Sequence, residues 1–538
     1  MIKTAWIQRS AVCLFMLIFS CSTVPEVPEE TVFRYNESTG ISTLDPAFAR
    51  EQSSIWACNQ LFNGLVQMND DLEVIPCIAQ SWTISDSGRT YTFALRDDVF
   101  FHSHFLFGED STRRVVASDF EYSFYRLTDP KTASPGAWVL QGVSSISATH
   151  QDTLVIHLKE PFSPFLGMLT MKYCSVVPRE IVEDLGDQFG REPIGTGPFS
   201  FQWWSTDEKL VFRKNPLYFE FEEGVRLPYL EAVAIDFITD RQAAFLEFLK
   251  GDIDLLSGLD ASYKDELLTS DGVLKEEYEG RFQLQKLPYL NTEYLAINQS
   301  WGEEQVISDV EFRRALNLSV DRVKMMRYLR NGIGHPADGG MIPSGLKGYH
   351  PARTGGYSFQ PDSAKVLLEM VRSRHNGAIP SVTLNTTSNY LDLCEYLQSS
   401  WNKMGIPVEV EVLPAPTLRE GKAEGTLAFF RASWIADYPD AENYLSLFYS
   451  ENFTPNGPNY TFFSNAEYDR LYALVRASTE DGERIEYYQK MDSILVAESP
   501  VVPLFYDEVV RFVPRSVEGL TPNALNLLDL KRVFKSVR

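Results

Sequence analysis

The chain has 538 residues and a formal net charge of −24, with 44% hydrophobic and 23% charged residues. This length predicts two or three domains, because a single hydrophobic core stops growing at roughly 250–300 residues. The acidic balance disfavours a nucleic-acid-binding protein, which needs clustered Lys and Arg. Beyond the N-terminus no segment approaches about 18 consecutive apolar residues, which disfavours an integral membrane permease.

The first 21 residues have the pattern of an export signal. Lys3 and Arg9 supply positive charge before an apolar run, 11–19, that is too short to span a bilayer. Ser20-Cys21 then resembles the cleavage box of bacterial lipoproteins. We therefore expect residues 1–21 to be a lipoprotein signal peptide with its lipobox, and Cys21 to be lipidated.

Phe19 departs from that box, where a smaller residue is usual, so two alternatives stay open: ordinary secretion with cleavage nearby, or a retained anchor helix. Residues 22–31 are polar, Pro-rich and acidic. This composition predicts a flexible tether between a membrane and the folded body.

Strands and helices are both predicted, which indicates an α/β protein without an evident internal repeat. Period-two alternation predicts strands at three places: Tyr91, Phe93 and Leu95; Leu154, Ile156 and Leu158; Val408, Val410 and Val412. A helix is expected from about Asp309 to Leu329, with Phe312, Leu316, Val320 and Val323 on one face and a capping box of Ser308 and Glu311. A second helix is expected from about Gly482 to Glu498, leading into the apolar strand Val501–Tyr506.

The sequence lacks the usual signatures of catalysis. There is no HExxH, GxSxG, GxxxxGK or GxGxxG motif. His102 and His104 would point the same way on a strand and could hold a metal, but with no further ligand nearby we expect surface or loop histidines. We expect no enzyme activity, no metal and no cofactor.

The cysteines beyond the signal are Cys58, Cys77, Cys174 and Cys394, with no CxxC pair. This spacing disfavours a metal cluster or a thioredoxin-type site. A Cys58–Cys77 disulfide and buried free thiols are both open.

Residues 431–444 (RASWIADYPDAENY) combine one cation, three large aromatics and three acids in a turn-prone stretch. This combination suits a ligand with separated charges, because a carboxylate accepts from an ammonium and a guanidinium binds a carboxylate with two hydrogen bonds. Alternatively, Asp437, Asp440 and Glu442 are solvated loop acids or a calcium-like cluster.

Several separated stretches resemble one known family in the order in which that family shows them. They are 44–46 (LDP), 61–65 (LFNGL), 78–82 (IAQSW) with 91–96 (YTFALR), 132–135 (TASP), 195–199 (GTGPF), 309–316 (DVEFRRAL) with 321–322 (DR), and 434–438 (WIADY). On these residues the chain resembles the extracellular solute-binding proteins, family 5, which include the oligopeptide-, dipeptide- and nickel-binding components of ABC importers.

The resemblance implies a bilobal periplasmic-binding-protein fold, class II-like and of cluster C, with an extra inserted domain. It places the first lobe at 32–65, 195–287 and 505–538, the inserted domain at 66–194, and the second lobe at 288–504. The lobes are expected to close over ligand by a hinge at the strands that cross between them.

The resemblance also implies roles for single residues. Asp437 would pair with a peptide's α-ammonium, and Arg431 would face its carboxylate. Trp434 and Tyr438 would wall the pocket. Tyr294 and Asn298 are further candidates, with a place in the core of the lobe as the alternative.

The implied function is capture of di- or oligopeptides and delivery to an ABC permease with its ATPase, by a monomer anchored at the cell envelope. It would face the periplasm, or the exterior of a single-membrane cell. The alternatives are the same fold with another solute (a nickel chelate, haem, a sugar or a modified amino acid), a ligand-presenting sensor subunit, and an exported hydrolase.

Overall fold

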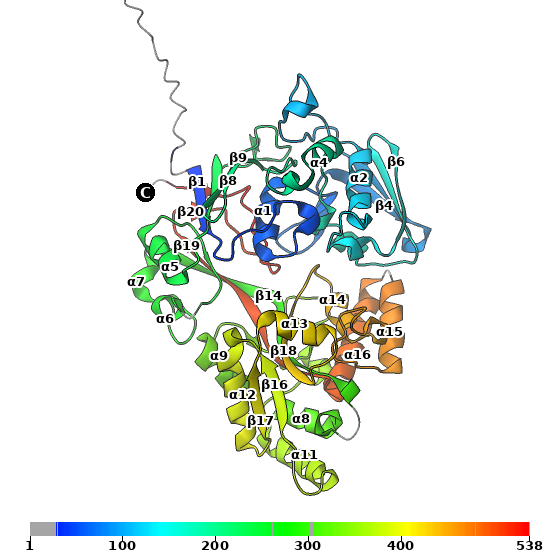
Figure 1. Ribbon diagram of the computed structural model, residues 1–538, viewed down its shortest axis with the longest axis vertical. Helices are drawn as coiled ribbons and strands as arrows, with labels where there is room; N and C mark the ends of the chain where they lie inside the picture. The colour runs from blue at the N-terminus through cyan, green and yellow to red at the C-terminus, as the bar shows by residue number, and fades with distance from the viewer. Residues whose placement is uncertain (1–27, 29–30, 261, 302–304, 479, 537–538) are drawn as a thin grey trace, which may run out of the picture.

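The computed structural model describes residues 28, 31–260, 262–301, 305–478 and 480–536. The predicted signal peptide, the lipidation at Cys21 and nearly all of the predicted tether lie outside the described residues. Within the described part of the chain, no helix is long and apolar enough to cross a membrane. Figure 1 shows two bodies of similar breadth joined by long strands.

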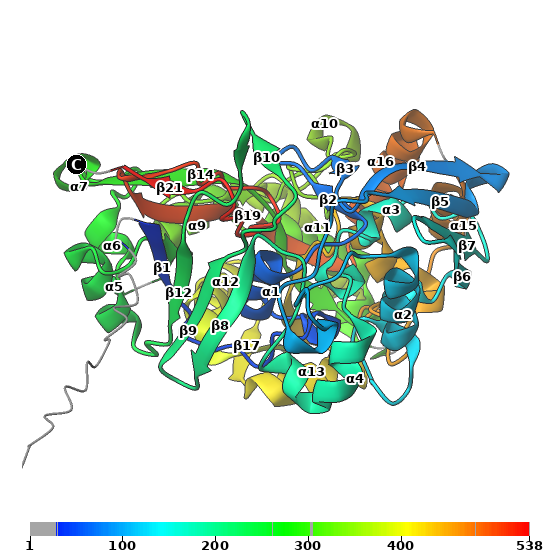
Figure 2. The same cartoon turned by 90° about the horizontal axis from the view of Figure 1, so that it is seen from above.

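The first lobe contains a four-stranded sheet in the order β1-β12-β9-β8, whose strands lie side by side in Figure 2. The strands are β1 (Val32–Asn36), β12 (Ala232–Asp236), β9 (Lys209–Lys214) and β8 (Phe199–Ser205). Only β1 and β12 are parallel. Helix α1 (Gln52–Leu61) packs here, and Phe33, Trp56 and Phe212 share one apolar core with Val513 and Leu528 of the C-terminal segment. Both ends of the described chain therefore build this lobe.

The inserted domain is an antiparallel sheet covered by helix α2 (Ala117–Thr128). Its order is β4-β5-β7-β6, with bounds β4 (Ala79–Ser85), β5 (Thr90–Leu95), β7 (Thr153–Leu158) and β6 (Val143–His150). The strands predicted at 91–95 and 154–158 are confirmed, and their alternating residues face the core because one side of the sheet is buried. Strands β2 (Val66–Met68) and β3 (Val74–Pro76) and helix α3 (Phe165–Met168) share the domain's apolar core, whereas α4 (Arg179–Leu185) buries Ile181 and Val182 in the core of the first lobe.

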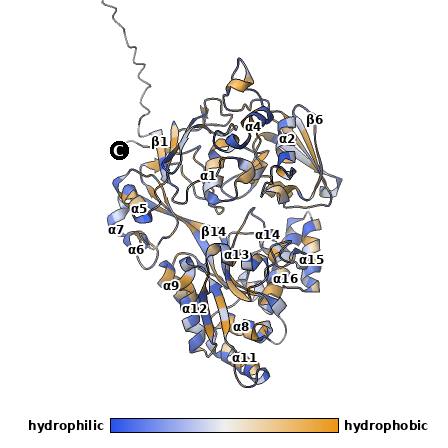
Figure 3. Cartoon of the chain, in the orientation of Figure 1, coloured by the Kyte–Doolittle hydropathy of each residue, from blue (hydrophilic) through white to orange (hydrophobic). Residues whose placement is uncertain are grey.

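The second lobe alternates strands and helices, as the α/β prediction requires. The run is β16 (Val382–Thr386), α12 (Leu391–Lys403), β17 (Val408–Val412), α13 (Ala415–Ala423) and β18 (Phe429–Ile435), and the three strands are parallel where they pair. The predicted strand at 408–412 is confirmed. Hydrophilic and hydrophobic residues alternate along α12 and α15 (Ala466–Ala477), as expected of helices with one buried face (Figure 3).

The remaining helices and short strands complete the two lobes. The helices are α5 (Arg241–Lys250), α6 (Lys264–Leu267), α7 (Glu276–Glu279), α10 (Pro351–Thr354), α11 (Pro361–Arg374), α14 (Glu442–Leu445), α15 (Ala466–Ala477) and α16 (Asp481–Glu498). The strands are β10 (Phe221–Glu222), β11 (Val225–Arg226), β13 (Leu256–Ser257), β15 (His335–Pro336), β20 (Val517–Glu518) and β21 (Phe534–Lys535). Helix α16 confirms the second predicted helix, which leads into a strand at Val501 as expected.

Two long antiparallel strands, β14 (Phe282–Ile297) and β19 (Val501–Pro514), cross between the lobes (Figure 1). The register of their pairing shifts between Glu293 and Tyr294 and, more widely, in mid-strand, where Pro288 pairs with Glu508 and the next pair is Thr292 with Tyr506. The three residues between are released from the ladder, so the strands are interrupted where they pass from one lobe to the other.

The helix expected over 309–329 is instead two helices, α8 (Val310–Leu318) and α9 (Arg322–Arg330). The break occurs because Asp321 caps a new helix by accepting from the Lys324 N–H at 3.0 Å. The expected capping box is also wrong: Asp309 is the N-cap and accepts from the Glu311 and Phe312 N–H groups. Val323, expected on the buried face, is 70% exposed.

The four described cysteines are buried free thiols, so no Cys58–Cys77 disulfide forms. Cys58 lies in the core of the first lobe and Cys77 in that of the inserted domain. His102 lies in a loop, as predicted, but it is buried: its Nε2 donates to the Gly197 carbonyl at 3.1 Å, and its Nδ1 accepts from the Gly195 N–H at 3.2 Å. The described residues contain no group of three or more His, Cys, Asp or Glu placed to hold a metal.

Candidate functional site: a cavity between the lobes

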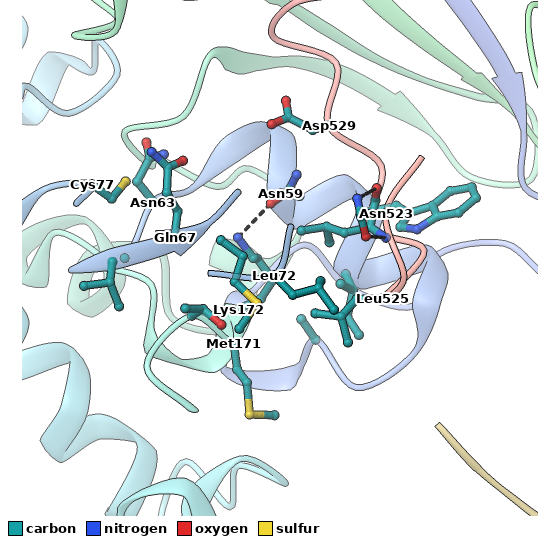
Figure 4. A pocket seen from close by; sticks show the side chains of 18 of the residues that line it. Asn59, Asn63, Gln67, Leu72, Cys77, Met171, Lys172, Asn523, Leu525 and Asp529 are labelled. Carbon is teal, nitrogen blue, oxygen red and sulfur yellow. Dashed lines mark hydrogen bonds between the residues drawn. The ribbon is translucent and has the colours of Figure 1, made fainter. Parts of the chain in front are cut away.

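A cavity of about 280 Å³ lies where the two lobes and the inserted domain meet. Asn59 and Asn523 line it from the first lobe, Gln67 and Lys172 from the inserted domain, and Tyr289 and Asp437 from the second lobe. Tyr289 belongs to the interrupted stretch of β14. The cavity is thus built from segments far apart in the sequence (Figure 4).

Asp437 lies two residues beyond the end of strand β18, and its loop is held by one side chain, that of Asn443. The buried Asn443 accepts from the Asp437 N–H at 3.2 Å and from the Trp434 indole N–H at 2.8 Å. Its own amide N–H lies 3.5 Å from the Asp437 carboxylate. The carboxylate is therefore held in place by Asn443, a residue that sequence reasoning missed and that no motif marks.

The Asp437 carboxylate has no basic group within ion-pair distance in the described part of the chain. The residue is exposed, but the surface it exposes is that of the cavity. Desolvation by the surrounding protein raises the pKa of Asp437 to about 6, although the hydrogen bond from Asn443 acts in the opposite direction. The Asp437 charge in turn contributes, after desolvation, to raising the pKa of Tyr173 to about 12. A cation entering the cavity would relieve this penalty.

Arg431 does not line this cavity. Its guanidinium forms a two-point ion pair with Glu293 of β14, with Nη2 2.6 Å from Oε2, and it stacks 3.3 Å from the centre of the Tyr390 ring. Burial alone would lower the pKa of Arg431, but the Glu293 carboxylate raises it above its ordinary value. The structure therefore gives Arg431 an internal counter-ion.

Trp434 and Tyr438 flank the Asp437 loop without lining the cavity. The Trp434 indole holds Asn443, as described above. The Tyr438 ring joins the apolar core of the inserted domain, and its hydroxyl donates to Glu442, which also accepts from Tyr472. Tyr438 is thus a contact between the second lobe and the inserted domain.

Tyr294 and Asn298 lie inside the second lobe. Tyr294 is 4% exposed and belongs to an apolar core cluster. Asn298 is fully buried, and its amide donates to the carbonyls of Gly425 at 3.0 Å and Leu427 at 3.3 Å. Both residues form part of the frame that positions β18.

The other acids of the 431–444 segment are engaged within the second lobe. Asp440 pairs with Arg484 and accepts from the Tyr488 hydroxyl, while Glu442 accepts from two tyrosines. Of the three acids in this segment, only Asp437 faces the cavity.

The fold and the cavity together define a class: a two-lobed binding protein with its site beside the crossing strands. The family model for bacterial extracellular solute-binding proteins, family 5, matches residues 73–456, which is more than half of the chain. The protein belongs to this family of solute-binding proteins.

Relatives and solved structures match over nearly the whole chain. The "Probable deoxycholate-binding periplasmic protein YgiS" of Escherichia coli strain K12 is 28% identical, covering 93% of this chain and 92% of that protein. The periplasmic murein peptide-binding protein MppA of the same strain is 28% identical, covering 96% of each. The structure of DppA from Helicobacter pylori in complex with peptide STSA superposes with a TM-score of 0.77 at 25% identity, covering 94% of this chain and 98% of that one.

Proposed function

We propose that this protein captures peptides in the cavity between its lobes and delivers them to an ABC permease and its ATPase. The observation that carries the proposal is the Asp437 carboxylate, which faces the cavity and lacks a cationic partner among the described residues. A peptide's α-ammonium supplies that cation. The relatives whose names include peptide ligands, and the solved complex with a peptide, support the same ligand class.

The energetics follow from desolvation. A charged group enters a closed cavity at low cost only when an opposite charge and hydrogen bonds replace its hydration. A hydrogen bond to a charged group contributes about 1.5–3 kcal/mol. Asp437 is held ready by Asn443, so the protein need not order this carboxylate when ligand arrives.

The remaining expectations from the sequence belong to the same proposal. The protein is exported, anchored through a lipid on Cys21, and monomeric. Its lobe boundaries lie at 65/66, 194/195, 287/288 and 504/505, and the crossing strands act as the hinge. The interruption of the β14–β19 ladder between Pro288 and Thr292 supports the third of these boundaries.

Calorimetry on the mature protein tests the proposal with trialanine and N-acetyl-trialanine. We expect the free-amine peptide to bind at least about tenfold more tightly, since one charged hydrogen bond is at stake. Asp437→Asn should remove this difference. The control is Asp440→Asn, which alters an acid of the same segment outside the cavity. If its melting temperature stays near wild type, it should preserve the difference.

Deoxycholate is the informative rival ligand, because it carries a carboxylate and no ammonium. Binding of deoxycholate without any peptide binding would refute the proposal. Recovery of intact trialanine after prolonged incubation separates binding from hydrolysis, and cleavage products would favour the exported-hydrolase alternative.

A further inference from the structure

We infer that Lys172 binds the carboxylate of the ligand, so that the cavity selects short zwitterionic peptides whose two charged ends bridge Asp437 and Lys172. The inference rests on the proposed function and adds a residue that the sequence does not mark. It also replaces Arg431 as the partner of the ligand's carboxylate.

Lys172 enters the cavity from the inserted domain, where it begins the short turn Lys172–Cys174. Its ammonium donates to Asn59 Oδ1 at 2.7 Å, the contact drawn as a dashed line in Figure 4. The Asn59 amide N–H donates to the Leu528 carbonyl at 2.9 Å, which turns the Asn59 oxygen toward Lys172. The lysine is therefore positioned by a neutral acceptor.

An ammonium has three donors, and Asn59 occupies one of them. In the described part of the chain, Lys172 forms no ion pair with a carboxylate, at a limit of 4 Å between nitrogen and oxygen. Desolvation is the largest influence on this side chain, and it lowers the pKa of Lys172. A partly desolvated ammonium with free donors is the natural partner of an incoming carboxylate, since an ion pair replaces the hydration that the ammonium lost on burial.

The groups around Lys172 leave this charge uncompensated. Burial raises the pKa of the Cys77 thiol to about 12 and that of the Cys58 thiol higher still, so both are neutral at physiological pH. Asp529 and Lys531 also act on Lys172, in opposite directions: the Asp529 carboxylate raises its pKa and the Lys531 ammonium lowers it. They lie 3.6 Å apart, so the Asp529 carboxylate is directed to Lys531.

The other two basic side chains that line the cavity in the described part of the chain are less suitable. Lys531 is paired with Glu220 at 2.8 Å and hydrogen-bonded to Gln67 at 3.0 Å. Arg50 lies at the rim, with 63% of its side chain exposed, where solvent weakens an ion pair. Arg431 lies outside the lining and is paired with Glu293.

Asp437 lines the cavity from the second lobe and Lys172 from the inserted domain, and no ion pair joins the two in the described part of the chain. A ligand with an ammonium and a carboxylate can satisfy both and thereby join the two bodies. The cavity volume of about 280 Å³ is at the small end for ligand sites, which favours a short ligand.

Calorimetry tests the inference with dialanine, trialanine and their C-terminal amides. Wild type should bind each free acid at least about tenfold more tightly than its amide. In Lys172→Met, which keeps the apolar stem, the two affinities should become equal through loss of free-acid binding alone. Arg50→Gln is the matched control: it removes a rim charge and should retain the preference.

Asn59→Asp provides a second variant should Lys172→Met fail to fold. It places a carboxylate beside the ammonium, and the preference for free acids should again disappear. An unchanged preference in a folded Lys172 or Asn59 variant overturns the inference. If wild type binds acids and amides equally, with binding still dependent on Asp437, the inference fails while the proposed function stands. If neither binds, the proposed function fails.

Discussion

Glu293 and Arg431 form a two-point ion pair across the adjacent strands β14 and β18. Glu293 is directly opposite Ser433, and Arg431 is opposite Leu295, so the pair is diagonal on one face of the sheet. The Glu293 side chain is 3% exposed and that of Arg431 is 14% exposed. This internal partner explains why an arginine in the ligand-like segment does not face the cavity.

Arg431→Ala should lower the free energy of unfolding by about 3–5 kcal/mol, because it leaves a buried carboxylate without its counter-ion. The double variant Glu293→Leu/Arg431→Met should recover most of this loss, since apolar replacement of a whole buried pair is often neutral. Urea unfolding measures both. Loss of the preference for free-acid peptides in the folded double variant would show instead that Arg431 acts on ligand.

Asp437 should reduce the stability of the ligand-free protein at neutral pH. Its pKa in the folded protein is about 6, above the ordinary value of 3.8. Between pH 3.8 and 6 Asp437 is therefore protonated in the folded state and ionised in the unfolded state. The free energy of unfolding therefore falls as pH rises through this window, and the penalty is complete above pH 6. Asp437→Asn should raise the melting temperature at pH 8 and leave it unchanged at pH 3.5.

A saturating free-amine peptide should remove most of that difference, because it binds the wild type more tightly than the variant and so stabilises it more. Scanning calorimetry with and without trialanine checks this. Equal melting temperatures of wild type and variant at pH 8, without peptide, would contradict a desolvated carboxylate.

Asn298→Ala should destabilise the second lobe by about 1–3 kcal/mol, because it leaves the carbonyls of Gly425 and Leu427 without their donor. Peptide affinity should stay within about twofold of wild type, since Asn298 lies outside the cavity lining. Urea unfolding and calorimetry on the same preparation separate the two effects. A large loss of affinity at unchanged stability would restore Asn298 as a binding residue.

His102 should make the protein acid-sensitive. Burial lowers its pKa from 6.5 to about 4, because desolvation disfavours the charged imidazolium. Protonation would also set a new N–H against the Gly195 N–H. The unfolded state then binds the proton first, so stability is complete above pH 6.5 and falls by about 3 kcal/mol as pH drops to 4. His102→Gln should show about 2–3 kcal/mol less of this loss between pH 7.5 and 4.5, measured by urea unfolding. His104→Gln, at a partly exposed neighbouring histidine, serves as the control.

Local sequence predicted much of the secondary structure for identifiable reasons. Alternation placed the strands around Phe93, Ile156 and Val410, because one face of each is more buried than the other. It failed at Asp321, where an apolar periodicity continued through a residue that caps a new helix. Periodicity reports which residues are apolar, while a cap depends on one side chain reaching a backbone N–H.

The sequence by itself determined the family and the α/β class, and it singled out Asp437 as a candidate. The family motifs are spread along the whole chain, and the acids of the short loop are neighbours in the sequence, so both can be recognised without a structure. Tertiary structure alone decided which charges line the cavity and which have an internal partner. Arg431 is neutralised by Glu293, 138 positions away, whereas Lys172 is positioned by Asn59, 113 positions away. Whether a charge is paired or free depends on neighbours brought together by folding, and spacing along the chain carries no record of them.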